Sequence, residues 1–398
     1  MSDDNRRPAS RIHGMDGLRA IAAMLVVAYH SGSLAGATSA GPLALIAAEL
    51  KAGVAVFFVI SGFLLYLPFA RAIGAGRTSP NWREYAARRA VRILPAYWAA
   101  LAMLAAVGEL HGVSLGDAWR FIGLGQIYSS STLGQGLPVA WSLDVEVTFY
   151  LVLPVLAWIA ARMARGSNRS GFEQQLTLIV GLALGSLVLR LMLARSLLAP
   201  VEYHLGLATA LPGMIDWFAL GMALAVWRSA AELGTEGPRW LNAVASRPGL
   251  CWLVALALYL LGVPAQGGEV FLASFGVAAH AIVGVAAFFL VLPVVAPRPA
   301  TQRGLVLPFL RSGLLTWLGT ISYGIYLWHV SFLRVVDPLL GVPRGVLAFL
   351  GLLLLTSAGA VCLGAASWYL VERPAHRAFR AGWIPLTTAL GRPAGEVA

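Results

Sequence analysis

Arg19 and His30 lie, together with Asp16, in an otherwise largely apolar segment, GMDGLRAIAAMLVVAYH. At about 100° and 1.5 Å per residue, a helix would carry both side chains on one face, about 16 Å apart along its axis. Histidine can act as a general base near neutral pH, and arginine can bind an anionic group, so we expect both residues to line one channel. In the alternative, Arg19 reaches the membrane surface, Asp16 caps the helix, and His30 is a hydrogen-bonded structural residue.

A second group consists of Arg88, Arg89 and Arg92, in the segment NWREYAARRAVRILPAYW. Their spacing places them on one short helix just before an apolar run. Guanidinium groups bind phosphate through paired hydrogen bonds, so the cluster suits the phosphates of a nucleotide or coenzyme. The alternative is that these arginines only orient the next span, because cytoplasmic loops are rich in basic residues.

Acidic, hydroxyl and histidine side chains enter other apolar segments. In WSLDVEVTFYLVLP, Glu146 lies deeper than Asp144 and shares a helix face with Tyr150. The alternative is a solvated first turn that holds both acids. Hydroxyl and aromatic residues also occur in three other segments, GVAVFFVISGFLLY, LGTISYGIYLWH and YLVERP. Such residues are typical of helix packing and of membrane interfaces. Neither role accounts for His329 and Glu372, which are therefore further candidates for function.

Transmembrane helices must position these residues. Of the 398 residues, 59% are hydrophobic and 12% are charged, as is typical of a polytopic membrane protein. Runs of about 20 apolar residues, enough to cross the hydrocarbon core, recur along the chain. We predict an all-α bundle of about ten transmembrane helices. The predicted spans are 17–35, 50–70, 93–108, 141–161, 173–194, 211–228, 250–264, 274–296, 314–333 and 345–370.

The distribution of charge predicts the orientation. With residue 1 in the cytoplasm, most of the 29 basic residues fall in cytoplasmic connections, so we expect both termini there. We expect a transmembrane domain over residues 1–372 and a short basic cytoplasmic tail over 373–398. The connections are too short for a soluble domain, and the first apolar run is long enough to remain as an anchor. Because topology explains the net charge of +11, we expect no nucleic-acid partner.

Taken together, the segments resemble the acyltransferase 3 family of membrane-bound O-acyltransferases over nearly the whole chain. Five motifs carry the resemblance in order: an arginine, ten residues and a histidine; FFxxSGFL; RxxR; WSLxxE; and SYxxYLxH. They fall on Arg19 and His30; on Phe57, Phe58, Ser61, Gly62, Phe63 and Leu64; on Arg89 and Arg92; on Trp141, Ser142, Leu143 and Glu146; and on Ser322, Tyr323, Tyr326, Leu327 and His329. One departure is Val147, which stands where family members commonly carry a second acid.

The resemblance implies transfer of an acyl group, by expectation acetyl, from cytoplasmic acyl-CoA to a hydroxyl of a sugar, glycan, glycolipid or secondary metabolite. His30 is the expected general base, and Arg19 lies on the path of the pantetheine arm. We expect Glu146 by preference, or else Asp16, to fix the tautomer of His30. A competing version has His30 accept the acyl group itself and pass it on.

The expected acyl-CoA site consists of Arg89, Arg92, Arg88 and Ser61, with the phosphates on the arginines. Supporting roles are expected for a further set of side chains: Asp144, Ser142, Tyr150, Tyr323, Tyr326, His329 and Glu372. We expect no metal and no permanently bound cofactor, with acyl-CoA as co-substrate. The expected setting is the lipid bilayer of a bacterial inner membrane, crossed several times. The competing class is a secondary transporter of a small anionic or carbohydrate solute, which also needs about ten spans and buried charges.

Overall fold

The structure, a computed structural model, describes residues 12–36, 50–166, 170–195, 206–262, 276–297, 304–340 and 345–382. Within these ranges every regular element is a helix. Eight helices are long and apolar enough to cross a membrane, and a ninth span results if the bent pair of α10 and α11 counts as one. The chain is therefore a polytopic helical membrane protein, as predicted.

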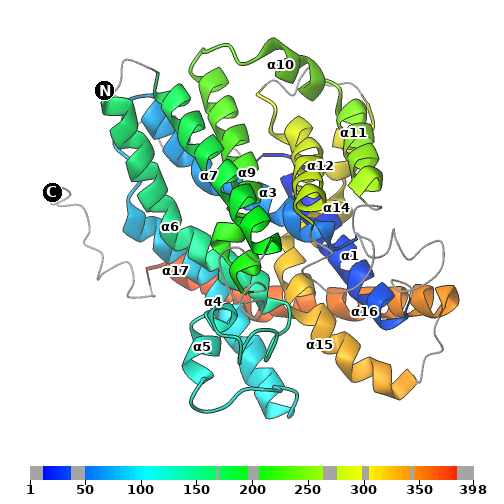
Figure 1. The fold of residues 1–398 in the computed structure, drawn as a ribbon. Coiled ribbons are helices and arrows are strands. Elements are labelled where there is room, and N and C mark those ends of the chain that lie inside the picture. The colour runs from blue at the N-terminus through cyan, green and yellow to red at the C-terminus, as the bar shows by residue number, and fades with distance from the viewer. Residues whose placement is uncertain are drawn as a thin grey trace.

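Eight long helices make up most of the bundle (Figure 1). They are α1 (Met15–Leu34), α3 (Gly53–Gly74), α4 (Trp82–Ala106), α6 (Ala140–Arg165), α7 (Gly171–Ala194), α9 (Leu211–Glu232), α12 (Val277–Val295) and α16 (Val346–Ser367). Shorter helices complete the bundle: η1 (Leu50–Ala52), α5 (Ala118–Ile122), η2 (Gln126–Tyr128), α10 (Arg239–Ala245), α11 (Pro248–Gly262), α13 (Val306–Leu310), α14 (Gly313–Thr320) and α15 (Ser322–Leu340).

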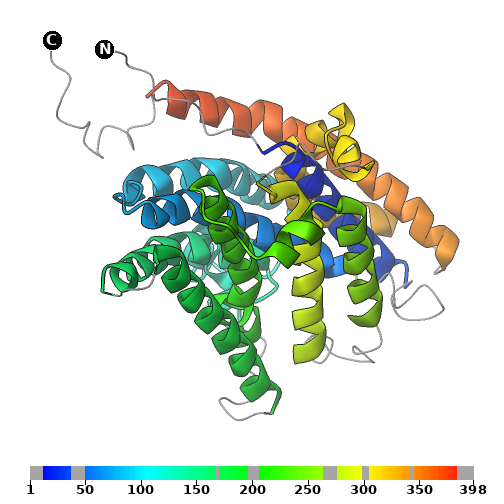
Figure 2. The same ribbon diagram turned by 90° about the horizontal axis from the view of Figure 1, so that it is seen from above.

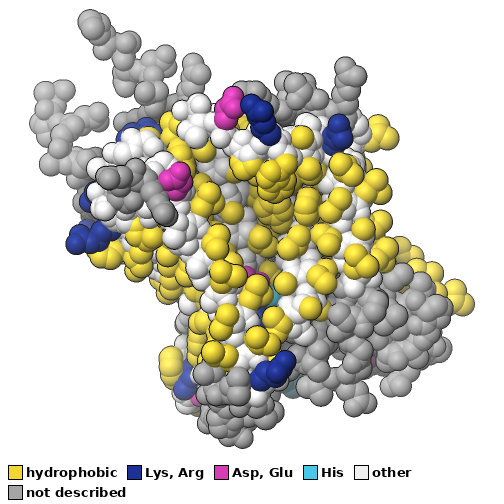
Figure 3. All heavy atoms as spheres, turned by 45° about the horizontal axis from the view of Figure 1, so that its top comes forward, with side chains coloured by type: hydrophobic (Ala, Val, Ile, Leu, Met, Phe, Trp, Pro, Cys, Tyr) yellow, Lys and Arg dark blue, Asp and Glu magenta, His cyan; other side chains and the backbone are white. Residues whose placement is uncertain are grey.

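The outer surface carries an apolar belt. Figure 3 shows hydrophobic side chains spread over the middle of one face, while most of the charged side chains lie toward its edges. Large apolar side chains are exposed on α7 and α16, whereas α3 and α9 are mostly buried inside the bundle. This distribution suits a bundle whose outer helices face lipid.

The centre of the bundle is the close pair α3 and α9. A Cβ added at Gly62 would lie 2.1 Å from the carbonyl oxygen of Phe218, and one added at Gly221 would lie 2.0 Å from that of Val59. Only glycine permits this backbone approach, which is typical of helix contacts in membranes. The FFxxSGFL motif is thereby held at the centre of the protein.

The first helix and the C-terminal helices pack on the elements that carry the other motifs. Helix α1 packs against α3, α14, α15 and α16, so the residues of the first span face the centre. Helix α16 continues through a π-helical turn (Trp368–Glu372) into α17 (Arg373–Arg380), and Figure 2 shows this long element along one edge of the molecule. Helix α17 and the π turn both contact α4, which carries the arginine cluster.

Several boundaries differ from the predicted spans. Helix α4 begins at Trp82 rather than near residue 93, because the Asn81 side chain accepts a hydrogen bond from the backbone N–H of Arg83 and starts the helix in a polar segment. The ninth predicted span is two helices, α14 and α15, separated at Ile321. The first part of the predicted tail, 373–380, is helical, and residues 383–398 lie outside the described ranges.

Candidate active site

Three cavities share their walls in sequence through the bundle. The arginine cavity, about 700 Å³, is lined by Arg19, Leu64, Leu65, Arg89, Arg92, Trp368, Arg373, His376, Arg377 and Arg380. The central cavity, about 80 Å³, shares Arg19, Leu64, Leu65, Arg89 and Arg92 with it and adds residues of α3, α6 and α15. The histidine cavity, about 570 Å³, contains His30 and shares Val54 and Tyr326 with the central cavity. Together they form a row of neighbouring cavities from the arginines to His30.

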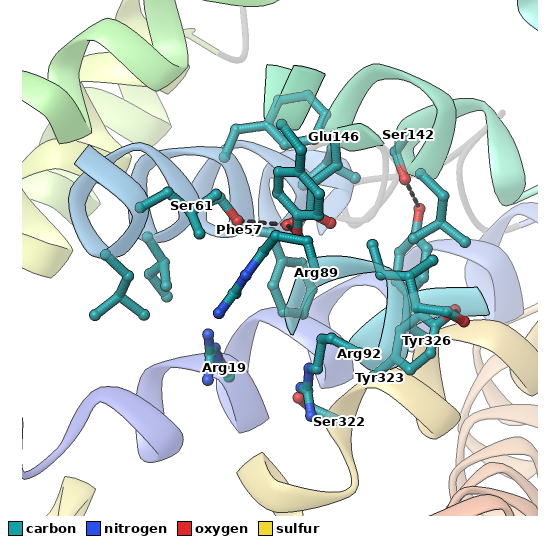
Figure 4. A pocket seen from close by; sticks show the side chains of 18 residues that line it. Arg19, Phe57, Ser61, Arg89, Arg92, Ser142, Glu146, Ser322, Tyr323 and Tyr326 are labelled. Carbon is teal, nitrogen blue, oxygen red and sulfur yellow. Dashed lines mark hydrogen bonds between the residues drawn. The ribbon is translucent and has the colours of Figure 1, made fainter. Parts of the chain in front are cut away.

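Glu146 occupies the wall of the central cavity (Figure 4). Its Oε1 accepts a hydrogen bond of 2.6 Å from Ser61 Oγ and another of 2.6 Å from the Tyr150 hydroxyl. Ser61 comes from α3, and Tyr150 lies one turn further along α6 than Glu146. The FFxxSGFL and WSLxxE motifs thus meet in one hydrogen-bonded group, which ties α3 to α6.

Three guanidinium groups surround the junction of the central and arginine cavities. Figure 4 shows the side chains of Arg19 and Arg89 pointing toward one another. Arg19 has Asp16 at 3.7 Å, and Arg92 has Glu372 at 3.9 Å, so both ion pairs are long. The Arg89 Nε atom is buried and has no hydrogen-bond partner among the described residues. Converging cations with an unused buried donor form a site for an anion such as phosphate.

Helix α17 adds three arginines to the site, from a segment that was predicted only as part of a basic tail. Arg373, Arg377 and Arg380 line the arginine cavity opposite α4. Their spacing of four and three residues is helical, and this spacing is the signal that could have placed them on one face. The π turn before α17 holds Glu372 buried beside Arg92, and π turns inside helices are frequent at functional sites. The arginines of this cavity therefore come from three helices, α1, α4 and α17, rather than from α4 alone.

His30 and His329 are direct neighbours at the other end of the row of cavities. Nδ1 of His30 lies 3.1 Å from Nε2 of His329, with ring centroids 4.9 Å apart. Each ring also meets a backbone carbonyl: His30 Nδ1 lies 3.0 Å from Val26 O, and His329 Nδ1 lies 2.7 Å from Tyr326 O. The pair joins α1 to α15, and His329 is fully buried.

These contacts determine the tautomers of the neutral imidazole pair. A carbonyl oxygen only accepts, so His329 Nδ1 carries a proton and donates it to Tyr326 O, which leaves Nε2 of His329 as an acceptor. Nδ1 of His30 must then carry the proton that it shares between Val26 O and His329 Nε2. The remaining nitrogen, Nε2 of His30, is unprotonated. It can take a proton or act as a nucleophile.

Tyr326 forms the wall between the central and histidine cavities. Its hydroxyl lies 2.6 Å from Ser142 Oγ and donates at 3.2 Å to Val139 O, and its ring packs edge-on against Phe57 at 5.8 Å. Tyr323 lies one turn earlier on α15 and donates to Ile93 O on α4 at 2.9 Å. The SYxxYLxH motif thus fixes α15 against α6 and α4 while presenting His329 to α1.

Two predicted partners of His30 lie elsewhere. The preferred partner, Glu146, is hydrogen-bonded to Ser61 and Tyr150 and lines the central cavity, so the histidine that contacts His30 is His329. The second, Asp16, precedes His30 by fourteen positions on α1, which is about 21 Å along a helix. The expectation of a carboxylate partner is therefore wrong, because the side chain that contacts His30 is the imidazole of His329.

Two further predicted residues stand beside the cavities. Asp144 is buried and accepts a hydrogen bond of 3.1 Å from the backbone N–H of Ile127, so it ties the turn at η2 to α6. Arg88 pairs with Glu84 and lines a neighbouring hollow of about 420 Å³ that also contains Arg89, Arg92 and Arg380. Within the described ranges, no three histidine, cysteine or acidic side chains gather as metal ligands would.

The helical bundle combines a cationic cavity, which suits an anionic substrate, with a histidine pair that suits proton transfer. Both features are suited to an enzyme that transfers a group from one substrate to another. The chain belongs to the acyltransferase 3 family, because the family's acyltransferase domain matches residues 12–365. It is therefore a membrane acyltransferase, and the transporter alternative is set aside.

Curated relatives agree with this family. The chain is 25% identical over 361 residues to the peptidoglycan O-acetyltransferase OatA of Listeria monocytogenes. This match covers 86% of this chain and 53% of OatA. It is 26% identical over 354 residues to Nodulation protein 10 of Rhizobium leguminosarum, in a match that covers 81% of each protein. It is 28% identical over 340 residues to the exopolysaccharide production protein ExoZ of Rhizobium meliloti, in a match that covers 83% of this chain and 90% of ExoZ. The chain spans about half the length of several relatives, OatA among them. No solved structure matches it.

Proposed function

We propose that this acyltransferase moves an acetyl group from acetyl-CoA to a hydroxyl of a cell-envelope glycan, with His30 as the general base. The observation that carries the proposal is the row of three neighbouring cavities, each sharing lining residues with the next, between the converging arginines and an unprotonated imidazole nitrogen. The names of two relatives, a peptidoglycan O-acetyltransferase and an exopolysaccharide production protein, support a glycan acceptor. These relatives are bacterial, which supports a place in the bacterial inner membrane.

The donor enters at the arginine cavity. Coenzyme A carries a diphosphate and a 3′-phosphate, and the arginines of α4 and α17 offer bidentate donors to both. The narrower central cavity then takes the pantetheine arm past Arg19 and Glu146. Since basic residues concentrate on the cytoplasmic side of membrane proteins, the arginine cavity faces the cytoplasm and His30 lies toward the outer side.

The transfer step uses one nitrogen of His30. Nε2 of His30 takes the proton of the acceptor hydroxyl while that oxygen attacks the thioester carbonyl carbon. The carbon–sulfur bond breaks, and the imidazolium returns the proton to the leaving sulfur. His329 Nε2 accepts the hydrogen bond from His30 Nδ1 throughout, so His329 fixes the tautomer and stabilises the positive charge on His30 in the transition state.

The experiment is ester analysis of envelope glycans in a deletion strain of the host organism, complemented with the wild-type chain or with His30→Ala. Loss of a general base costs about 10²- to 10⁴-fold in rate, so the ester should be absent with His30→Ala at equal protein level in the membrane. The matched control is His111→Ala, an exposed histidine outside the three cavities, and it should restore the ester. A normal ester level with His30→Ala would refute the assignment.

The same purified variants separate direct transfer from an acyl-histidine relay. With radiolabelled acetyl-CoA and no acceptor, direct transfer leaves the protein unlabelled. A label that depends on His30 and is released by hydroxylamine would instead establish the relay.

A further inference from the structure

Two of the described lining residues, Val54 and Tyr326, border both the central cavity and the histidine cavity. Under the proposed function, the acetyl group arrives through the central cavity, and the acceptor hydroxyl lies beside His30 in the histidine cavity. The thioester carbonyl therefore reacts next to this shared wall. Since Val54 is apolar, Tyr326 supplies the polar side chain of the pair.

Transfer of the acetyl group places negative charge on the thioester oxygen. As the acceptor oxygen adds to the carbonyl carbon, the electron pair of the C=O π bond moves to this oxygen. The pair returns when the carbon–sulfur bond breaks and the sulfur leaves with the proton from His30. Hydrogen-bond donors fixed where such charge develops lower the barrier strongly. Because His30 holds the acceptor proton in this step, a separate donor is needed.

The hydroxyls of Tyr326 and Ser142 form a network in which one bond is weak. The Tyr326 oxygen lies 2.6 Å from Ser142 Oγ (Figure 4), and Val139 O lies 3.2 Å from the Tyr326 oxygen and 3.3 Å from Ser142 Oγ. Two hydroxyls hold two protons, so one serves the short contact and the other is left for Val139 O. That second distance exceeds the usual O–H···O range of about 2.5 to 3.0 Å, so little is lost when this proton turns to another acceptor.

The carbonyl that would release this proton has a second function. Val139 is the N-cap residue of α6, and the carbonyl of an N-cap residue accepts the first hydrogen bond of its helix. The Tyr326 hydroxyl can therefore turn to a substrate oxygen without leaving a buried acceptor unpaired. Ser142 then donates to Tyr326, and a hydroxyl that accepts one hydrogen bond is polarised and donates the next more strongly.

The backbone of α15 fixes this hydroxyl relative to the catalytic base. Tyr326 and His329 are one turn apart, their ring centroids lie 5.7 Å apart, and His329 contacts His30. The Tyr326 ring is buried and packs edge-on against Phe57. A donor held in this way needs little reorganisation when charge develops, which is the property that makes such groups effective.

We infer that Tyr326 is a catalytic residue, whose hydroxyl donates to the thioester oxygen as it becomes an oxyanion, and that Ser142 is a positioning residue that orients and polarises this hydroxyl. The inference rests on the proposed function and adds to it a group that stabilises charge. The base and the oxyanion donor then lie on either side of the reacting carbonyl.

The first test measures steady-state transfer of radiolabelled acetyl by the full chain in lipid nanodiscs. Tyr326→Phe removes one oxygen and keeps the ring, so kcat should fall about 10²- to 10³-fold, as for loss of an oxyanion donor. Both KM values should stay within about twofold of the wild type, because the contact forms only in the transition state. Ser142→Ala removes one neutral hydrogen bond and should lower kcat about 3- to 10-fold.

The matched control is Tyr97→Phe. Tyr97 is also a buried tyrosine whose hydroxyl donates to a backbone carbonyl, that of Phe121 at 2.7 Å, and it lines none of the three cavities. This variant should keep the wild-type kcat. Thermal midpoints establish that each variant is folded.

The second test separates charge stabilisation from the binding of coenzyme A. Acetonyl-CoA is a methyl ketone, whereas trifluoroacetonyl-CoA has the same skeleton but adds water to form a tetrahedral hydrate that resembles the intermediate. Analogues of the transition state depend on the same contacts that lower the barrier. Tyr326→Phe should therefore raise the dissociation constant of the fluorinated analogue at least about tenfold and that of acetonyl-CoA no more than about twofold.

Two results would overturn the inference: a folded Tyr326→Phe variant with kcat within twofold of the wild type, or an equal loss of affinity for both analogues. If Tyr326→Phe does not fold, Ser142→Ala decides, and a wild-type kcat in that variant would overturn the inference. Failure of the proposed function gives a different pattern. In that case His30→Ala would keep its kcat, or the wild type would transfer no acetyl group from acetyl-CoA, while the fluorinated analogue would still bind Tyr326→Phe more weakly.

Discussion

Replacing His329 is the sharpest perturbation of the proposed mechanism, because His329 contacts His30 and lines none of the three cavities. His329→Leu removes the acceptor for the His30 Nδ1 proton, while Val26 O still accepts it. A hydrogen bond to a charged group is worth about 1.5 to 3 kcal/mol, and this one gains its charge only when His30 is protonated. With each 1.36 kcal/mol worth about tenfold in rate, kcat should fall roughly 10- to 150-fold.

His329→Gln distinguishes positioning from bulk. Its side-chain carbonyl oxygen can stand near the place of His329 Nε2 and accept from His30 Nδ1, so this variant should keep severalfold more activity than His329→Leu. The assay is transfer of radiolabelled acetyl from acetyl-CoA to envelope glycan fragments by protein in nanodiscs. The KM values of donor and acceptor should stay within about twofold of the wild type, since the lost contact matters in the transition state.

The control for fold is the thermal midpoint, because His329 is fully buried and His329→Leu removes a contact between α1 and α15. His111→Leu serves as the same substitution at an exposed site. A folded His329→Leu variant that keeps kcat within twofold of the wild type would contradict the positioning role of His329. Equal impairment of the Leu and Gln variants would also contradict it, because the acceptor atom would then be irrelevant.

Three other perturbations give separate outcomes. Arg89→Ala combined with Arg92→Ala should raise the KM for acetyl-CoA about 100-fold, because each lost charged contact costs roughly 1.5 kcal/mol. Steady-state kinetics measure this change, and a result in which only the acceptor KM rose would contradict the phosphate site. Arg377→Ala combined with Arg380→Ala should raise the same KM about tenfold for acetyl-CoA but little for 3′-dephospho-acetyl-CoA; an equal effect on both donors would exclude contact with the 3′-phosphate. Gly221→Ala places a Cβ 2.0 Å from a backbone oxygen of α3, so it should lower the free energy of unfolding by about 1 to 3 kcal/mol, seen as a lower thermal midpoint. An unchanged midpoint would show that α9 can shift to make room for the added methyl group.

The sequence predicts the helices well because hydrophobic length is a local property. Each predicted span coincides with one or more helices, and the main differences arise where polar residues extend a helix or break it. Helix α4 starts in polar residues with an Asn81 cap, and the ninth span breaks at Ile321. A hydropathy profile detects neither a polar helix start nor a break within an apolar run, so these boundaries could not be predicted from it.

The candidate site was predicted in part. The shared face of Arg19 and His30 follows from helical spacing, and the arginines of α4 were singled out from their number. The contact between His30 and His329 joins residues 299 positions apart, and helical periodicity says nothing about which helices meet. Glu146 was the expected partner of His30 because the two residues were placed at similar depth in the membrane. Depth alone does not determine which neighbouring helix a side chain faces.

The wall between the central and histidine cavities has a consequence for the cell as well as for catalysis. Val54 and Tyr326 border both cavities, and Tyr326 is held by Ser142 and Val139. Under the proposed topology these cavities lie toward opposite faces of the bilayer, and Val54 and Tyr326 are the residues that their described linings share. If the proposed function holds, Val54 and Tyr326 would also form the seal against proton and ion leakage, and replacing them with smaller residues would be expected to discharge the membrane potential even where transfer survives.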